Sequence, residues 1–195
     1  LVHPTREGSR FADLKAIAEA DGMRISGALV THYHPDHCGG SMAGFSIEGA
    51  AELQYTIPAM RVEYVRHEPA GVPTAFWRGV GPTHNVFVVE SFIDELAHAG
   101  GRDPLAFRLE LLGDKDIMPG TGERGQPYSV ARMRKVLQEV AEKSGWGKHK
   151  FARGQGAGVA FHFSHRGYVA EVAEVTVSKA GELKVDRVVV VTDIG

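Results

Sequence analysis

The sequence lacks the features of several protein classes. It has a single cysteine, Cys38, so no intrachain disulfide can form, and a reducing compartment, the cytoplasm, is expected. No apolar run is long enough to cross a bilayer, and the start lacks both the layout of a signal peptide and an initiator methionine, so a truncated N-terminus is expected. The formal net charge is only −2, which implies no nucleic acid and no anionic membrane as partner.

The 195 residues nevertheless contain enough apolar material for a packed core, because 43% of them are hydrophobic. Apolar periodicity and end signals predict helices at 11–22, 86–101, 103–112 and 129–145. Alternating or apolar runs predict strands at 25–32, 60–69, 158–165, 168–178 and 182–193. Together these elements predict an α+β fold in which helices pack on a mixed or antiparallel sheet.

Local signals define the ends of several of these elements. Asp103 can cap a helix whose first position is Pro104, and the turn at 179–182 makes the last two strands a hairpin. The stretch at 70–85 holds three glycines and two prolines, and is predicted to be an irregular loop. The helix at 129–145 is amphipathic, with an apolar face of Val130, Met133, Leu137 and Val140.

A dense histidine loop with the spacing His-x-His-x-Asp-His follows the strand predicted at 25–32. Imidazole and carboxylate groups are good zinc ligands at neutral pH. His32 and His34 could hold one metal together, while Asp36 and His37 face a neighbouring position. Over residues 10–50 the string resembles the metallo-β-lactamase-fold hydrolases, which implies a two-metal zinc centre that acts on an ester, amide or thioester.

The remaining ligands of such a centre are not evident downstream. Two metals with two ligands each would be weakly held, and the family supplies further histidines in a Gly-His-Thr-type context. The later histidines lack that context: His67, His84, His98, His149, His162 and His165. We therefore favour a ligand set without its partners over an intact zinc hydrolase. The hydrolase would require a third and a fourth ligand to converge on His32 and His34, and the candidates are His67, His84, His162 and His165.

A second signature occupies residues 71–112. Its marks are the loop Phe76, Trp77, Arg78, Gly79, Val80 and Gly81, the helix with Glu90 and Asp94, and Asp103-Pro104 with Arg108. The stretch resembles the molybdopterin-binding large subunit of the xanthine dehydrogenase and aldehyde oxidase family, in particular the isoquinoline 1-oxidoreductase β-subunit type. Residues 154–195 continue the resemblance, which covers about residues 55–195 in all.

The resemblance implies that residues 76–81 line the molybdenum site of a molybdopterin cofactor. Glycines let backbone N–H groups approach the oxygens of such a cofactor closely. The helix that follows would offer free N–H groups and its positive end, and Arg78 would add a fixed positive charge. Without the resemblance, a Gly/Pro loop with one arginine would be interpreted as a surface turn.

By the same resemblance, the reaction is hydroxylation of a small-molecule substrate, an aldehyde or an N-heterocycle. In the family a glutamate from a Gly-Glu-Pro-like segment acts as the base, and electrons leave through iron–sulfur clusters. This sequence contains neither that segment nor a cysteine set, so the catalytic residues stay unknown and the clusters are assigned to a partner subunit. Glu90, Asp94 and Glu95 are interpreted as solvated or paired carboxylates.

The two resemblances predict two domains, a metallo-β-lactamase-like fragment at 1–54 and a partial molybdopterin-binding domain at 55–195, joined near 50–58. The favoured function is a partial cofactor-binding domain of a molybdenum-dependent oxidoreductase, incomplete as an enzyme. The alternatives are a zinc-dependent hydrolase that uses the histidine loop, and a non-enzymatic fold that has kept neither chemistry.

Overall fold

The computed structural model describes residues 46–65, 78–118 and 127–195. Contacts divide the chain into two compact units. One, here called the sheet unit, comprises Gln54–Thr56 and Asp103–Gly195, and the other, the loop unit, comprises Leu1–Leu53 and Ile57–Arg102. Among the described residues, no helix has both the length and the apolarity that crossing a bilayer requires.

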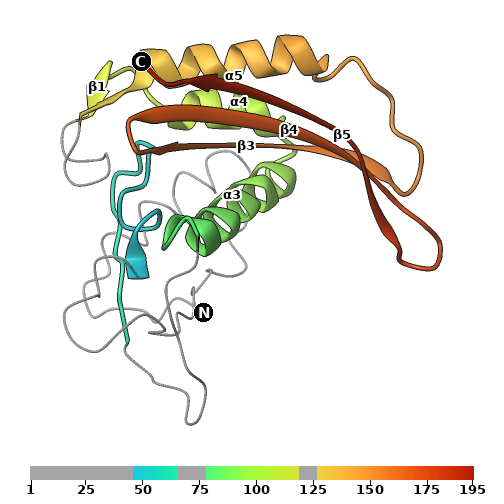
Figure 1. Ribbon diagram of the computed structural model, residues 1–195, viewed down its shortest axis with the longest axis horizontal. Coiled ribbons are helices and arrows are strands. Elements are labelled where there is room, and N and C mark those ends of the chain that lie inside the picture. The colour runs from blue at the N-terminus through green and yellow to red at the C-terminus, as the bar shows by residue number, and fades with distance from the viewer. Residues whose placement is uncertain (1–45, 66–77, 119–126) are drawn as a thin grey trace. The chain divides into compact units, whose positions relative to one another are not determined.

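The sheet unit is built on three antiparallel strands that follow one another in space as in sequence (Figure 1). A short pair of strands precedes them and leads into a helix. The strands are β1 (Ile117–Met118) paired with β2 (Tyr128–Ser129), and β3 (Gln155–Ser164), β4 (Gly167–Val177) and β5 (Leu183–Asp193). The predicted antiparallel sheet and its last hairpin are therefore confirmed.

Two helices cover one face of this sheet, as Figure 1 shows: α4 (Pro104–Leu111) contacts β3, and α5 (Val130–Ser144) contacts β4 and β5. The predicted cap of α4 is confirmed, because Asp103 accepts a hydrogen bond from Ala106 N at 2.8 Å. Gly145, with a φ of 73°, ends α5 in the left-handed region that glycine adopts readily.

The core of the sheet unit lies between α5 and the sheet. The apolar face predicted for α5 is buried, with Met133, Leu137 and Val140 fully so. Aromatic side chains fill the end of this core, where the ring of Tyr128 lies 5.4 Å from that of Phe163 and both contact Tyr168. The remaining buried residues of the strands are Val159, Phe161, Ala170, Val172 and Val191.

A three-residue segment from earlier in the chain completes the sheet unit. Gln54 is buried, and its side-chain amide bonds both backbone groups of Phe163: Nε2 donates to the carbonyl at 2.9 Å and Oε1 accepts from N–H at 2.8 Å. The ring of Tyr55 packs edge to face on Phe161, with centroids 5.0 Å apart. Thr56 N donates to Leu111 O at 2.7 Å, so the segment bridges β3 and the end of α4.

The described part of the loop unit consists of the segments 46–53 and 57–65, the turn at 78–81 and α3 (Pro82–Ala99). α3 buries Asn85, Glu90, Ile93 and Ala97. Pro82 occupies its first turn, where its missing N–H costs no helical hydrogen bond.

Three expectations about element boundaries are corrected. α3 begins at Pro82, within the stretch predicted as loop, because proline is well suited to the first helical turn. β3 begins three residues earlier than predicted, at Gln155. Residues 60–65 form no strand although Val62 and Tyr64 alternate with polar residues; Val62 is exposed, so the alternation does not mark a half-buried face here.

Candidate cofactor site

The predicted cofactor loop is described from Arg78 onward, and it turns directly into α3. Gly79 has a φ of 87° and Val80 a φ of 50°, so two consecutive residues lie in the left-handed region. For a β-branched residue such as Val80 this conformation is an outlier. Backbone strain of this kind clusters at ligand-binding turns, which supports the choice of this turn as a candidate site.

Position 79 is sterically confined as well. A Cβ added to Gly79 would collide with Thr83 Oγ1, which donates a hydrogen bond to Arg78 O at 2.7 Å. Thr83 thereby ties the first turn of α3 to the loop. Arg78 and Gly79 are exposed, whereas Gly81 is buried against the unit. The exposed side of the turn therefore consists of a guanidinium group and a backbone without a side chain.

The start of α3 has no side-chain cap, yet its N–H groups are not free as we expected. Thr83 N donates to Val80 O and His84 N donates to Gly81 O, each at the long distance of 3.3 Å. These weak bonds occupy the backbone N–H groups of Thr83 and His84, which we had expected to be free to bind an anion. What the turn still offers an anion is the positive end of the helix dipole and the fixed charge of Arg78.

A buried amide holds this end of α3 against an earlier part of the chain. Asn85 Nδ2 donates to the carbonyl oxygens of Ser46 and Glu48, both at 2.9 Å. Gly49, with a φ of 85°, lets the same segment approach closely, since a Cβ there would lie 3.1 Å from Pro82 Cα. The segment at 46–50 and the cofactor loop are therefore parts of one packed arrangement within the loop unit.

One carboxylate on α3 is buried. Glu90 is only 6% exposed and takes part in a polar interaction, whereas Asp94 is half-buried and Glu95 is exposed. The signal was present in the sequence, because Glu90 shares a helical face with Ile93 and Ala97, three and seven residues later. This buried carboxylate lies more than two turns along the helix from the loop and places a polar group inside the loop unit.

The other predicted site residues lie outside the described residues. These are Phe76 and Trp77 of the cofactor loop and the whole histidine loop, His32, His34, Asp36 and His37. In the parts of the chain that the structure describes, no group of three or more metal-ligating side chains is found. Of the later histidines, His98 is exposed, and His165 lies in a turn with a φ of 51° rather than on a strand as predicted.

A second polar cluster, which the sequence did not reveal, lies at the carboxyl end of β5. Arg132 of α5 donates two hydrogen bonds to Asp193, at 2.8 and 2.5 Å, and its guanidinium carbon lies 4.4 Å from the centre of the Tyr168 ring. The bonds from Arg132 lower the pKa of Asp193 from 3.8 to about 2. The same pair raises the pKa of Arg132, so both groups stay charged over the ordinary pH range.

The amino-acid sequence of the chain matches a known family of domains. The model of the molybdopterin cofactor-binding domain matches residues 9–112, which is more than half of the chain. The match ends at Leu112, the residue directly after α4, and it includes the turn at 78–81. The matched range also spans residues 50–58, where the sequence suggested a junction between two domains, and that division stays a prediction.

Three known proteins share sequence with most of the chain. One of the subunits of nicotinate dehydrogenase from Pseudomonas putida is 33% identical over 72% of the chain, and the β-subunit of isoquinoline 1-oxidoreductase from Brevundimonas diminuta is 29% identical over 73%. A membrane-bound aldehyde dehydrogenase (pyrroloquinoline-quinone) from Gluconacetobacter polyoxogenes is 33% identical over 60%. The chain spans only 12%, 17% and 15% of the length of these three relatives, respectively.

None of these findings supports the metallo-β-lactamase resemblance or a zinc site. The histidine loop falls inside the stretch that the molybdopterin family model matches. The family model and two of the sequence relatives lead to the same assignment: the chain belongs to the molybdopterin cofactor-binding domains of the xanthine dehydrogenase family.

Proposed function

We propose that this chain contributes part of the cofactor pocket of a molybdenum-dependent oxidoreductase, through the loop of Phe76, Trp77, Arg78, Gly79, Val80 and Gly81. The observation that carries the proposal is the pair of left-handed residues Gly79 and Val80 directly before α3, inside the stretch that the family model matches. A strained turn within a cofactor-binding domain is more economically explained by ligand contact than by folding alone.

The chemistry of the turn suits an anionic, oxygen-rich cofactor. Arg78 supplies a permanently charged, multiply donating group for phosphate or pterin oxygens, on the exposed side of a turn that Thr83 holds against the start of α3. The dipole of the 18-residue helix α3 adds positive potential at the same place. When bound, the cofactor would supply the redox chemistry of hydroxylation, while these residues bind and orient it.

We propose the substrate class and the partner subunit from the names of the relatives. Two of the relatives are named for nicotinate and isoquinoline, which are aromatic N-heterocycles, and one for an aldehyde. We infer hydroxylation of an aldehyde or an N-heterocycle as the reaction of the whole assembly. An iron–sulfur subunit that accepts the electrons is the companion we expect, since two relatives are named as subunits.

The test is whether the full chain carries molybdenum and pterin after co-expression with the cofactor-assembly machinery. We expect both in the purified protein, the metal by elemental analysis and the pterin by fluorescence after oxidation. Arg78→Ala should lower the content about tenfold, because a charge-assisted hydrogen bond contributes about 1.5–3 kcal/mol. Arg166→Ala, which removes an exposed arginine of the sheet unit, should leave it unchanged.

Protein with the far-ultraviolet circular dichroism of a folded α+β chain, but with neither metal nor pterin, would contradict the proposed binding. Equal content in the wild type and in Arg78→Ala would contradict the role given to that side chain. If elemental analysis finds zinc and no molybdenum in the purified protein, the zinc-dependent hydrolase would be favoured instead.

A further inference from the structure

Charge is unevenly distributed along the chain, although the net charge is only −2. From residue 143 to residue 170 the sequence contains no Asp or Glu, yet it holds Lys143, Lys148, Lys150, Arg153 and Arg166. Three of these cations fall in the connection between α5 and β3. With Lys179 of the β4–β5 turn they form a group that we call the basic end: Lys148, Lys150, Arg153 and Lys179.

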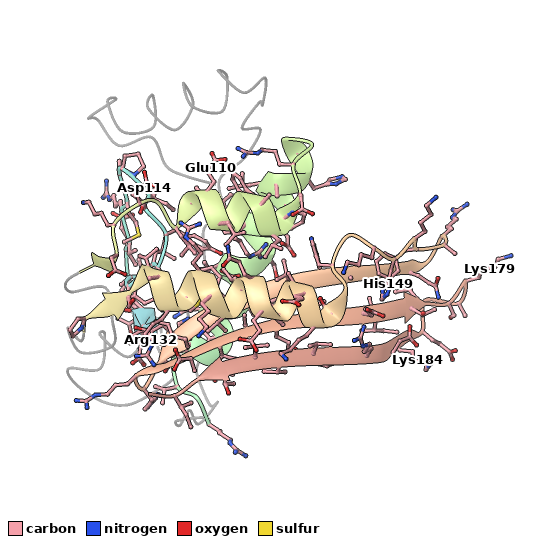
Figure 2. All side chains as sticks on the ribbon, turned by 90° about the horizontal axis from the view of Figure 1, so that it is seen from above. Glu110, Asp114, Arg132, His149, Lys179 and Lys184 are labelled. Atoms are coloured by element: carbon pink, nitrogen blue, oxygen red, sulfur yellow. The ribbon has the colours of Figure 1, made fainter. Side chains whose placement is uncertain are left out.

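The strand pairing brings Lys179 to the same end of the sheet as the other three. Val177 N donates to Gly154 O at 2.6 Å, so the residue after Arg153 lies beside the strand end that leads to Lys179. Figure 2 shows Lys179 and His149 at one end of the sheet unit, and Arg132 at the other. The basic end is therefore a single surface region and not a set of scattered charges.

The cations of the basic end are not neutralised within the part of the chain that the structure describes. All four side chains are exposed, and none takes part in a hydrogen bond or an ion pair there. Neighbouring cations do have carboxylate partners, namely Lys143 with Glu139, Lys184 with Asp186 and Arg187 with Glu174. Solvated lysines are common, but a group of unpaired cations beside paired ones indicates a positively charged surface that is available to bind a partner of opposite charge.

Three contacts tie the connection that carries these cations to the rest of the sheet unit. Trp146 Nε1 donates to Asp103 Oδ2 at 2.9 Å at its start, and Ala152 N donates to Gln155 Oε1 at 3.2 Å at its end. In the middle, His149 Nδ1 lies 3.2 Å from a carboxylate oxygen of Glu174. A loop ordered before binding loses less entropy when it binds, so its charges are preorganised for a partner.

An exposed aromatic ring lies among these charges. Phe151 is 43% exposed, between Lys150 and Arg153 in sequence, and its ring packs at right angles against that of His149, 6.4 Å away. A half-exposed phenyl ring amid cations provides apolar contact area where the charges provide attraction, and this combination is typical of protein interfaces.

We propose that the basic end docks a protein partner through a carboxylate-rich surface, with Phe151 as the apolar contact. A nucleic acid suits this surface less well. The exposed carboxylates Glu142 and Glu182 flank the basic end, and a long phosphate backbone would have to pass beside them. A compact acidic patch on a protein can match the cations and avoid both flanking charges.

The experiment uses the whole chain and a fluorescein-labelled oligoglutamate peptide as the probe, with fluorescence anisotropy as the readout. The charge-reversed variant K148E/K150E/R153E should raise the Kd about tenfold or more at low salt. The matched control K115E/K135E/R166E changes the net charge by the same amount at exposed positions elsewhere, and should raise the Kd less than about threefold. Phe151→Ala should weaken binding of a peptide that also carries leucine, and this loss should persist at high salt.

Equal effects of the two triple variants would overturn the proposal, because binding would then follow net charge alone. An oligothymidylate of equal charge that binds as tightly as the peptide, and is lost in K148E/K150E/R153E, would also overturn it in favour of a nucleic-acid site. The neutral variant K148Q/K150Q/R153Q, which is gentler to the fold, should give an intermediate Kd. Peptide binding does not need the cofactor. The docking proposal can therefore fail while the proposed molybdopterin binding stands, and the molybdopterin binding can fail while the docking proposal stands.

Discussion

The two units of the chain are stabilised in different ways. In the sheet unit an amphipathic helix and aromatic strands bury a largely apolar core, which also encloses the polar side chains of Arg108 and Gln54, and almost every element is defined by its own local sequence. In the loop unit the described helix buries an amide, a carboxylate and only two apolar side chains, next to two left-handed residues. The difference indicates that the sheet unit supplies stability, while the loop unit carries the strained, polar arrangement that a cofactor site requires.

The sharpest test of this contrast lies in the core of the sheet unit. Leu137→Ala should lower the free energy of unfolding by about 2–5 kcal/mol, because it truncates a fully buried side chain and leaves a cavity in its place. The control Leu183→Ala, at a position that is 67% exposed, should change it by less than about 0.5 kcal/mol. Urea denaturation followed by circular dichroism measures both, and similar values for the two would contradict the proposed core.

In the loop unit, the largest effect should come from a hydrogen-bonding side chain. Asn85→Ala removes the donor to Ser46 O and Glu48 O, and should destabilise the packing of that segment by about 1–3 kcal/mol. Hydrogen exchange should accelerate at 46–50 and in the first turns of α3, but not in β3–β5. Glu95→Ala, on the exposed side of the same helix, should change neither region, and faster exchange throughout the sheet would refute the separation of the two units.

A smaller effect is expected at the start of α4. Asp103→Ala removes the cap on Ala106 N and the acceptor of the Trp146 indole, and should cost about 1 kcal/mol of stability. The fluorescence of Trp146 should shift because its environment changes. Asp103→Asn, which keeps an acceptor oxygen, should retain most of the stability, and a loss as large as that of alanine would argue against the cap.

The smallest effect is a dependence on pH. Because the folded-state pKa of Asp193 is lowered from 3.8 to about 2, its contribution to stability is present above about pH 4 and is lost as the pH falls toward 2. Asp193→Asn should therefore lower stability at neutral pH and flatten the slope between pH 4 and pH 2. Asp186, whose pKa is also lowered, by Lys184 and Thr176, contributes to the same slope, so Asp186→Asn serves as the comparison. An unchanged slope in Asp193→Asn would contradict the pairing with Arg132.

The sequence predicted the sheet unit well because its signals are local. The cap at Asp103, the apolar face of α5 and the turn before β5 each lie within a few residues of the element that they define. The strand predicted at 60–69 was wrong for residues 60–65. Alternation alone makes no strand where Val62 is exposed and no neighbouring strand pairs with the segment in the described residues.

The candidate site was harder to predict because its contacts join distant residues. The turn at Arg78–Gly81 was found by family resemblance, but its left-handed Val80 has no signature in a single sequence. The bonds from Asn85 to 46–48 and from Gln54 to Phe163 span 37 to 109 residues, and local patterns do not report such pairs. Glu90 could have been found, since it lies on the buried face of its own helix.

The central claim, that the strained turn before α3 binds the cofactor, is tested most directly by the molybdopterin content of two matched glycine variants. Gly79 and Gly101 lie at opposite ends of α3 and both have positive φ, but only Gly79 belongs to the turn, and a Cβ at Gly101 meets nothing within 4 Å. After co-expression with the assembly machinery, Gly79→Ala in a Thr83→Ala background, where the added Cβ no longer meets Oγ1, should lose about 90% or more of the bound pterin, and Gly101→Ala in the same background should retain as much as Thr83→Ala alone. Equal retention, or equal loss with both variants folded, would contradict the claim.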